Sequence, residues 1–210
     1  MVFEISIFTT DELHSRVGYQ AVNRAKTYIE GAFRNSEHSA NVNAMQRQVW
    51  APQEQERGSF RDTQCYGTVD YSNLTEWWRD NIYCNEGESQ DCDLLLTAHD
   101  GEAGRAIGDQ FAVSEGGTHI ADLPSDYWLW GCARRFDSMQ TALHEVAHTL
   151  MNDGAAAEHD SGYTYVHQDK DKNARTPMGD PNTTNRCGNY VRSFDCNEMR
   201  WSECTESHMT

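Results

Sequence analysis

The stretch Asp137–Met151, DSMQTALHEVAHTLM, is the clearest helix of the sequence, and the fold can be argued outward from it. Four of its apolar residues recur at intervals of three and four, which is the spacing of one face of an α-helix. These residues are Leu143, Val146, Ala147 and Leu150. A helix with this pattern packs its apolar face against a core and presents other residues on the opposite side.

Two histidines of this helix lie close together away from the apolar stripe. His144 and His148 are four residues apart, so at ~100° per residue they differ by only about 40° around the helix axis. Imidazoles one turn apart can bind one zinc ion from a single face. Glu145 lies beside the pair, where a carboxylate can take a proton from a zinc-activated water. The string HEVAH therefore predicts a zinc site with Glu145 as its general base.

Catalytic zinc sites have three protein ligands and one open position for water, so a third ligand is expected downstream. The candidates are His159, Asp160 and His167. His159 is favoured because it lies in the turn-like segment EHDSG, whereas Asp160 could instead orient a ligand by accepting a hydrogen bond. For His167, and for the histidines at positions 14, 38, 99, 119 and 208, surface or packing roles are expected.

Three motifs in this part of the chain resemble a known family. HEVAHTL, GAAAEHD and TPMG are similar to motifs of the metzincin zinc endopeptidases, and among them of the adamalysin-like (reprolysin) branch. That family's motif, HExxHxxGxxH, supplies three histidine ligands and a catalytic glutamate, and a methionine-containing turn passes beneath the zinc. The resemblance implies that His144, His148 and His159 bind zinc. It also implies that Glu145 is the catalytic base and that Met178 is the methionine of the turn.

One spacing departs from the family's motif. In the family, a glycine follows the second histidine by three residues and the third histidine follows it by six. Met151 and Gly154 occupy those positions here, and His159 follows His148 by eleven residues. The assignment of His159 therefore requires an insertion, and Asp160 is the alternative third ligand, as in zinc enzymes that use an aspartate.

The remaining patterns predict the other elements of the fold. In chain order we expect a strand at Val2–Phe8, a long helix at Asp11–Arg34, a strand at Val42–Trp50, a charged loop at Pro52–Asp62, a helix at Tyr71–Tyr83 capped by Ser72 or Thr75, strands at Asp93–His99 and Arg105–Val113, and a short helix at Phe194–Cys204. Gly108 is expected to let a backbone approach closely within the second of those last two strands. DLLLTAHDG and GRAIGDQFA are similar to the family's central strand and its substrate-binding edge strand.

These elements predict one α/β (α+β) domain spanning residues 1–210. The resemblance implies a metzincin-like fold, with a mixed twisted sheet and long helices in an upper part, about 1–152. A loop-rich lower part, about 153–210, would lie below the zinc cleft. The six tryptophans include Trp77 and Trp78, which are expected to anchor a helix in the core.

The charge and the cysteines indicate the environment in which the protein works. There are 33 acidic residues against 17 basic ones, a net charge of −16, and lysine occurs only at positions 26, 170 and 172. This composition resembles that of proteins from salt-loving microbes, and self-repulsion predicts a stability that rises with ionic strength. The sequence has no basic patch of the kind that binds nucleic acid, so a nucleic-acid partner is not expected. No apolar run reaches the ~18 residues of a membrane span.

Seven cysteines, none of them in a CxxC pair, favour disulfides in an oxidising compartment. Two closely spaced pairs suit short disulfide loops, Cys84 with Cys92 and Cys196 with Cys204, although spacing alone leaves many connectivities open. The start of the chain, MVFEISIFTT, reads as a strand rather than a signal peptide. We therefore expect a trimmed mature domain of a secreted, extracellular protein.

The sequence as a whole predicts a secreted, monomeric zinc-dependent endopeptidase that acts on protein or peptide substrates. A second hypothesis is a zinc-stabilised binding or adhesion module without catalysis. In that case a fourth protein ligand, such as Asp160 or a cysteine, would close the site.

Overall fold

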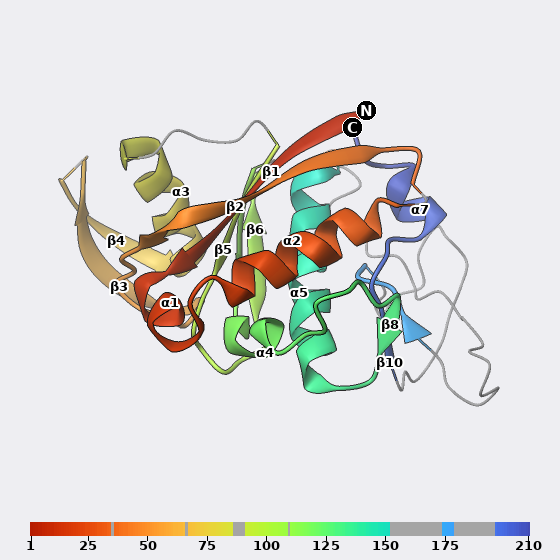
Figure 1. Cartoon of the computed structure of the whole chain (residues 1–210). Coiled ribbons are helices and arrows are strands. Elements are labelled where there is room, and N and C mark those ends of the chain that lie inside the picture. The colour runs from red at the N-terminus through yellow and green to blue at the C-terminus, as the bar shows by residue number, and fades with distance from the viewer. Residues whose placement is uncertain (35, 66, 86–90, 109, 152–173, 179–195) are drawn as a thin grey trace.

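The computed structural model describes residues 1–34, 36–65, 67–85, 91–108, 110–151, 174–178 and 196–210 (Figure 1). Its elements are, in chain order, β1 (Val2–Thr10), α1 (Asp11–Val17), α2 (Gln20–Ala32), β2 (Ser39–Val49), β3 (Arg57–Gln64), β4 (Gly67–Asn73), α3 (Leu74–Asn85), β5 (Cys92–Leu96), β6 (Gly104–Ile107), β7 (Phe111–Ser114), α4 (Gly117–Ala121), β8 (Trp130–Gly131), α5 (Arg134–Leu150), β9 (Ala174–Arg175), β10 (Cys196–Glu198) and α7 (Glu203–Glu206). Among the described residues, no helix is long and apolar enough to cross a membrane.

A five-stranded mixed sheet has the strand order β2-β1-β5-β7-β6. Strand β1 is parallel to both β2 and β5, and β5 is parallel to β7, whereas β6 is antiparallel to β7 at one edge. Every residue of β5, CDLLL, is buried, as is typical of a parallel strand with both faces covered. The α/β (α+β) class predicted from the sequence is confirmed by this arrangement.

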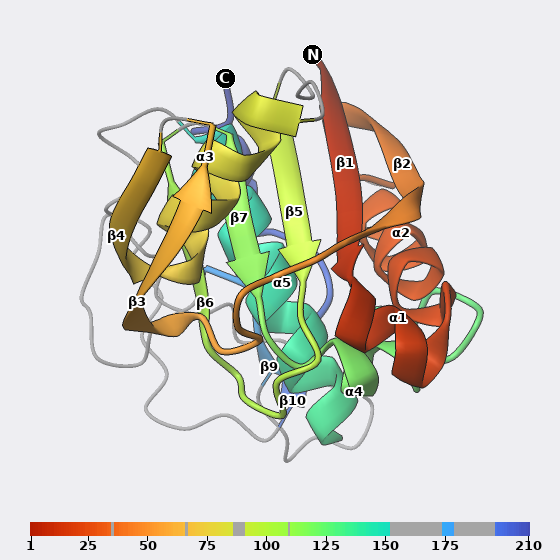
Figure 2. The same cartoon turned by 90° about the vertical axis from the view of Figure 1, so that its left-hand side faces the viewer.

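Helices cover both faces of the sheet, with α2 and α5 on one face and α3 on the other (Figure 2). Successive strand residues point to opposite faces. Leu94 and Ala112 accordingly pack with α2 and α5, while their neighbours Leu95 and Val113 pack with α3. The sheet therefore separates two apolar clusters, one for each layer of helices.

The helix predicted over Asp11–Arg34 is wrong in one respect, because the structure forms two helices there, α1 and α2. Gly18 lies between them with φ 58° and donates its N–H to the carbonyl oxygen of His14 at 2.7 Å. This left-handed backbone conformation suits glycine and ends α1. The four-residue recurrence of apolar side chains continues across the break, so the pattern did not reveal it.

The strand predicted over Arg105–Val113 is also wrong as a single element. It is the hairpin of β6 and β7, with Gly108 in the turn at φ 61°. A Cβ at Gly108 would meet nothing within 4 Å. Gly108 therefore serves the turn by its positive φ and not, as expected, by a close backbone approach.

Tertiary pairing overrides the local pattern at two further places. Within the predicted helix Phe194–Cys204, the segment Cys196–Glu198 is strand β10, which pairs with β8 and β9. Within the predicted loop Pro52–Asp62, strand β3 begins at Arg57 and pairs with β4. Both segments are strands because their backbones form hydrogen bonds with partner strands. The partners of β10 lie far away in the sequence, and the pairing of β3 with β4 is not visible in the apolar spacing of either strand.

The helix predicted over Tyr71–Tyr83 is confirmed as α3, which begins at Leu74. Neither Ser72 nor Thr75 is its cap, because the side chain of Asn73 accepts the N–H of Glu76 at 2.9 Å. Trp77 and Trp78 are both fully buried, as expected. Asparagine is among the best N-cap residues, since its short side chain reaches the first free amides of a helix.

The two predicted disulfides are wrong. Cys84 pairs with Cys65, and Cys196 pairs with Cys132, across sequence separations of 19 and 64 residues. Cys92 is a thiol buried in β5. The fold brings the Cα atoms of the two actual pairs to 5.9 Å and 4.1 Å, whereas sequence spacing carries no information on such long-range proximity. The disulfides tie the β3–β4 hairpin to α3, and β10 to the segment before α5.

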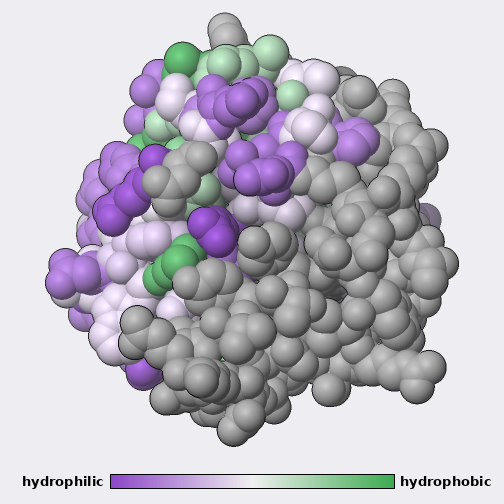
Figure 3. Space-filling view, turned by 90° about the vertical axis from the view of Figure 1, so that its right-hand side faces the viewer, coloured by the Kyte–Doolittle hydropathy of each residue, from purple (hydrophilic) through white to green (hydrophobic). Residues whose placement is uncertain are grey.

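One face of the molecule is mainly polar in its described part. On the face shown in Figure 3, hydrophilic residues dominate the described part, with small separate hydrophobic patches. The division into parts at about residue 152 falls at the edge of residues 152–173, which lie outside the described structure, and it stays a prediction.

Candidate metal centre and active site

The helix predicted over Asp137–Met151 is confirmed as α5, which begins three residues earlier at Arg134 and ends at Leu150. All four residues of its predicted apolar stripe are buried, with at most 2 % of their surface exposed. His144 and His148 are partly exposed. The helix thus places its apolar residues in the core and both imidazoles at its partly exposed side.

The two imidazoles of α5 point toward one another. The Nε2 atoms of His144 and His148 are 3.0 Å apart, and the rings are nearly perpendicular, at 83°. The Nδ1 of His144 lies 2.6 Å from the carbonyl oxygen of Pro177. A carbonyl oxygen only accepts, so Nδ1–H of His144 donates to it and the lone pair of the neutral ring lies on Nε2. This is the orientation of a histidine prepared to bind a metal through Nε2.

The segment Thr176–Met178 lies against the same helix. Gln140 of α5 donates through Nε2 to the carbonyl oxygen of Thr176 at 2.9 Å. Gln140 lies one turn before His144, which donates to the carbonyl oxygen of Pro177. Met178 is fully buried and belongs to the apolar cluster on the α5 face. The residue expected in the methionine turn therefore follows directly on the carbonyl that orients His144.

Glu145 lies against the edge of the sheet. It is 6 % exposed, and a Cβ at Gly104 would stand 2.6 Å from its Cγ and 2.7 Å from its Oε1. Only glycine at the start of β6 leaves space for this side chain. The close approach thus occurs at Gly104, whereas the sequence suggested it four residues later.

Burial, with the nearby Glu56 carboxylate as the next cause, raises the pKa of Glu145 to about 8, and Arg105 opposes that rise. The cause is physical, because removing water disfavours the charged form of a carboxyl group. A cation next to the carboxylate acts in the opposite direction, since it favours the ionised form. Glu145 is therefore placed to hold a proton or release one according to the charge beside it.

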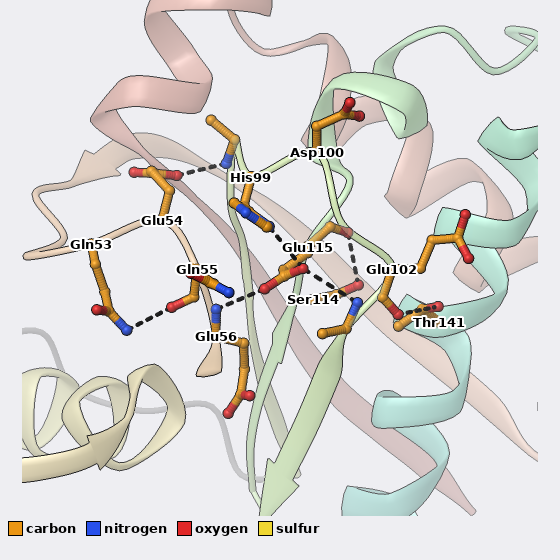
Figure 4. Close-up of polar contacts among 12 residues, drawn as sticks. Gln53, Glu54, Gln55, Glu56, His99, Asp100, Glu102, Ser114, Glu115 and Thr141 are labelled. Carbon is orange, nitrogen blue, oxygen red and sulfur yellow. Dashed lines mark hydrogen bonds and ion pairs between the residues drawn. The ribbon is translucent and has the colours of Figure 1, made fainter. Parts of the chain in front are cut away.

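A buried carboxylate holds the loop that leads into β6 (Figure 4). Glu115 follows β7 and is only 2 % exposed. It accepts the backbone N–H of Glu56 at 2.8 Å and that of Ala103 at 3.3 Å, and it lies 2.9 Å from Nδ1 of His99. Satisfying a buried charge with several donors fixes the backbone that supplies them. The loop between β5 and β6 is thereby positioned from the sheet side.

The same loop is tied to α5. The hydroxyl of Thr141 donates to the carbonyl oxygen of Glu102 at 3.3 Å, as Figure 4 shows. Thr141 is one turn before Glu145 on the helix, and Glu102 is two residues before Gly104. The edge strand and the helix that carries the histidines are therefore held as one unit.

The residues that the structure describes fit a metal centre in part. A separation of 3.0 Å between the two Nε2 atoms is compatible with zinc–nitrogen bonds of ~2.0–2.1 Å to one ion. His159, Asp160 and His167 lie outside the described residues, and within the described residues no group of three metal-binding side chains occurs. Two of the predicted ligands thus come together, and the third stays a prediction.

The other described histidines take part in polar contacts or packing, as expected. His119 contacts Asp100 through Nε2, and His38 contacts the carbonyl oxygen of Glu206 at 3.1 Å. The ring of His14 packs on Tyr19, with centroids 4.4 Å apart.

Sequence reasoning missed Gly104, Glu115 and Thr141. A glycine at the start of an edge strand is a usable signal for Gly104. No local pattern marks Glu115, because its partners come from residues 56, 99 and 103 and meet only in the folded chain.

Compared with protein-family models and with curated protein sequences, the chain matches none. Its function is therefore argued from the site itself.

Proposed function

We propose that the chain is a zinc-dependent endopeptidase that hydrolyses peptide bonds in proteins or peptides. One observation carries the proposal: two imidazoles converge through Nε2 on α5, and the carboxylate between them in sequence lies against the backbone of edge strand β6. Among the described residues, a pair of metal-binding side chains, a carboxylate that can carry a proton and an edge strand lie together, and metal-assisted peptide hydrolysis can use all three. A metzincin-like architecture is part of this proposal.

His144 and His148 would hold the ion, with His159 as the third ligand and Asp160 as the alternative. Zinc, when bound, supplies electrophilic chemistry, polarising a carbonyl and making water more acidic. The carbonyl of Pro177 keeps the His144 lone pair on Nε2 by accepting from Nδ1. Met178, the residue after Pro177, is fully buried in the apolar cluster on the α5 face and would anchor this segment.

Glu145 would move the proton. Water attacks the carbonyl carbon of the substrate, and its proton passes to the Glu145 carboxylate. The same proton then goes to the amide nitrogen as the carbon–nitrogen bond breaks, which leaves a free amine and a free carboxyl group. Burial of Glu145 strengthens the electrostatic interactions on which both transfers depend.

Strand β6 would hold the substrate. It is the last strand in the order of the five-stranded sheet, so one of its edges faces away from β7. An extended peptide can add to such an edge through main-chain hydrogen bonds. Because Glu145 contacts the backbone at Gly104, a peptide on this edge passes beside the proton carrier.

The proposed setting is extracellular. The two disulfides favour an oxidising compartment, and the net charge of −16 favours function in salt. We propose a monomer with protein or peptide substrates and with neither nucleic acid nor membrane as a partner.

Glu145→Gln tests the proposal, because the change removes the proton carrier and keeps the shape of the side chain. We expect zinc content to stay at the parent level while hydrolysis of casein falls by about 100- to 10,000-fold. The exposed Glu30, which pairs with Lys26 on α2, gives the matched control Glu30→Gln, and this variant should cleave like the parent.

Two outcomes would contradict the proposal in different ways. Equal cleavage by Glu145→Gln and the parent would remove the assigned role of Glu145. A parent chain that retains zinc but cleaves no unfolded protein would favour the zinc-stabilised binding module.

A further inference from the structure

Strand β6 carries a single basic side chain, Arg105, in a chain with a large acidic excess. Arg105 is exposed. Among the described arginines, some pair with carboxylates, namely Arg16, Arg61, Arg79, Arg134 and Arg200. Arg105 is not one of these arginines, although its charge acts on Glu56 and Glu145 and lowers the pKa of both carboxyl groups. The position of this exposed guanidinium on the edge strand therefore calls for an explanation.

The ladder between β6 and β7 shows which backbone groups face outward. The N–H of Glu115 donates to the carbonyl oxygen of Ala103 at 2.9 Å, which marks these residues as a hydrogen-bonded pair. Hydrogen-bonded and non-hydrogen-bonded pairs alternate in an antiparallel ladder. Arg105, opposite Val113, therefore directs its N–H and C=O toward β7. Gly104 and Ala106 direct theirs toward the outer edge.

The side chains of β6 alternate between the two faces of the sheet. Ala106 packs with the apolar cluster on the α5 face, and a Cβ at Gly104 would point at Glu145 on that same face. Arg105 lies opposite Val113, which belongs to the cluster on the α3 face. The guanidinium thus leaves the strand on the side away from α5.

The alternation of backbone hydrogen bonds and the alternation of side chains along β6 together determine which groups an added strand would contact. A peptide that adds antiparallel to β6 on its outer edge would bond to the backbone of Gly104 and Ala106. Its residue opposite Arg105 would then form a non-hydrogen-bonded pair with Arg105. In such a pair the Cα atoms are only about 4.5 Å apart and both side chains stand on the same face. Opposite charges at this position attract, and like charges repel.

We propose that β6 selects peptides with aspartate or glutamate opposite Arg105, so that the chain cleaves at a fixed distance along the peptide from an acidic residue. This inference rests on the proposed endopeptidase function. The acidic residue is adjacent to the one opposite Gly104, where Glu145 contacts the strand. Arg105 is thus a specificity residue, which contacts the substrate away from the reacting bond.

The net charge of −16 makes the choice of peptides important. A strongly acidic protein repels acidic peptides at long range, and this effect would mask a local preference for them. The experiment therefore uses pairs of fluorogenic peptides of identical composition. In one member, glutamate occupies the scanned position and lysine a distant one, and in the other the two are exchanged.

At one scanned position, the parent should cleave the glutamate peptide with a roughly two- to fivefold higher kcat/KM than its permuted partner. Arg105→Gln should abolish this preference, and Arg105→Glu should reverse it in favour of lysine. The control Arg61→Glu changes an exposed arginine on β3 that pairs with Asp70, and it should keep the acidic preference.

Failure of the inference differs from failure of the proposed function. A parent that cleaves both members of every pair equally, or an Arg105→Glu variant that keeps the acidic preference, overturns the role of Arg105 alone. A folded, zinc-loaded parent that cleaves no peptide overturns the endopeptidase function and this inference with it.

Discussion

Helices α3 and α5 lie on opposite faces of one sheet, but they bury different kinds of side chain. The largest buried side chains of α3 are Trp77 and Trp78. The indole nitrogen of Trp78 donates to the carbonyl oxygen of Asp93 at 2.9 Å. Helix α5 buries an apolar stripe as well, but also Gln140 and Glu145. Polar burial costs free energy unless it is compensated. The comparison indicates that α3 mainly stabilises the sheet, whereas α5 also carries the residues of the proposed site.

The largest expected effect on stability is on the α3 face. Trp78→Phe leaves a cavity and removes the hydrogen bond from the indole to the carbonyl oxygen of Asp93, so we expect the free energy of unfolding to fall by about 2–4 kcal/mol. Urea unfolding measures this, and Trp50→Phe at an exposed position should stay within about 0.5 kcal/mol of the parent. The zinc content of the folded Trp78 variant should be unchanged. Loss of zinc without loss of stability would break the comparison.

The next effect is on the α5 face and concerns activity. Gly104→Ala places a methyl group 2.6 Å from Cγ of Glu145, so the carboxylate or β6 must shift. We expect kcat/KM to fall by about 10- to 100-fold, with zinc content unchanged.

Gly131→Ala is the matched control for that change. Its Cβ would meet Phe136 at 2.3 Å, so it also introduces a steric conflict on the α5 face, but not beside Glu145. The Gly131→Ala variant should keep the parent's activity per folded molecule. Full activity in the Gly104 variant would show that Glu145 does not depend on its contact with β6.

The smallest effect concerns a carboxylate on β10, which packs against α5. Burial raises the pKa of Glu198 above its ordinary value of 4.5, while Arg200 opposes the rise. A raised pKa in the folded state means that Glu198 favours folding below pH 4.5 and loses that contribution as pH rises through the folded-state value. Glu198→Gln stays neutral, so its stability relative to the parent should increase from pH 4 to pH 8. A constant difference between the two proteins in urea unfolding would contradict the shift.

The sequence predicted the elements that depend on local periodicity. Helix α5, its buried stripe and strand β1 follow from apolar spacing, which local physics determines. The break at Gly18 could not be predicted because the apolar spacing continues through it. The pattern predicts one strand where β6 and β7 form a hairpin, because a glycine in a strand and a glycine in a turn look alike in sequence.

The candidate site was predictable to the extent that it lies on one helix. His144, Glu145 and His148 are close in sequence, so helical geometry alone brings them together. The contact of Pro177 with His144, the approach of Gly104 to Glu145 and the network around Glu115 depend on segments distant in the chain. The predicted disulfides are wrong for the same reason, since Cys132 and Cys196 are 64 residues apart and come together only in the folded chain.

The central claim is tested most directly by the zinc content of the purified chain after refolding with excess metal and extensive dialysis. Elemental analysis should find one zinc ion per parent chain, and the variants His144→Ala and His148→Ala should each lose most of it while keeping the parent's helical content. A parent that retains no zinc would contradict the claim. So would a double variant lacking both imidazoles that retains as much zinc as the parent.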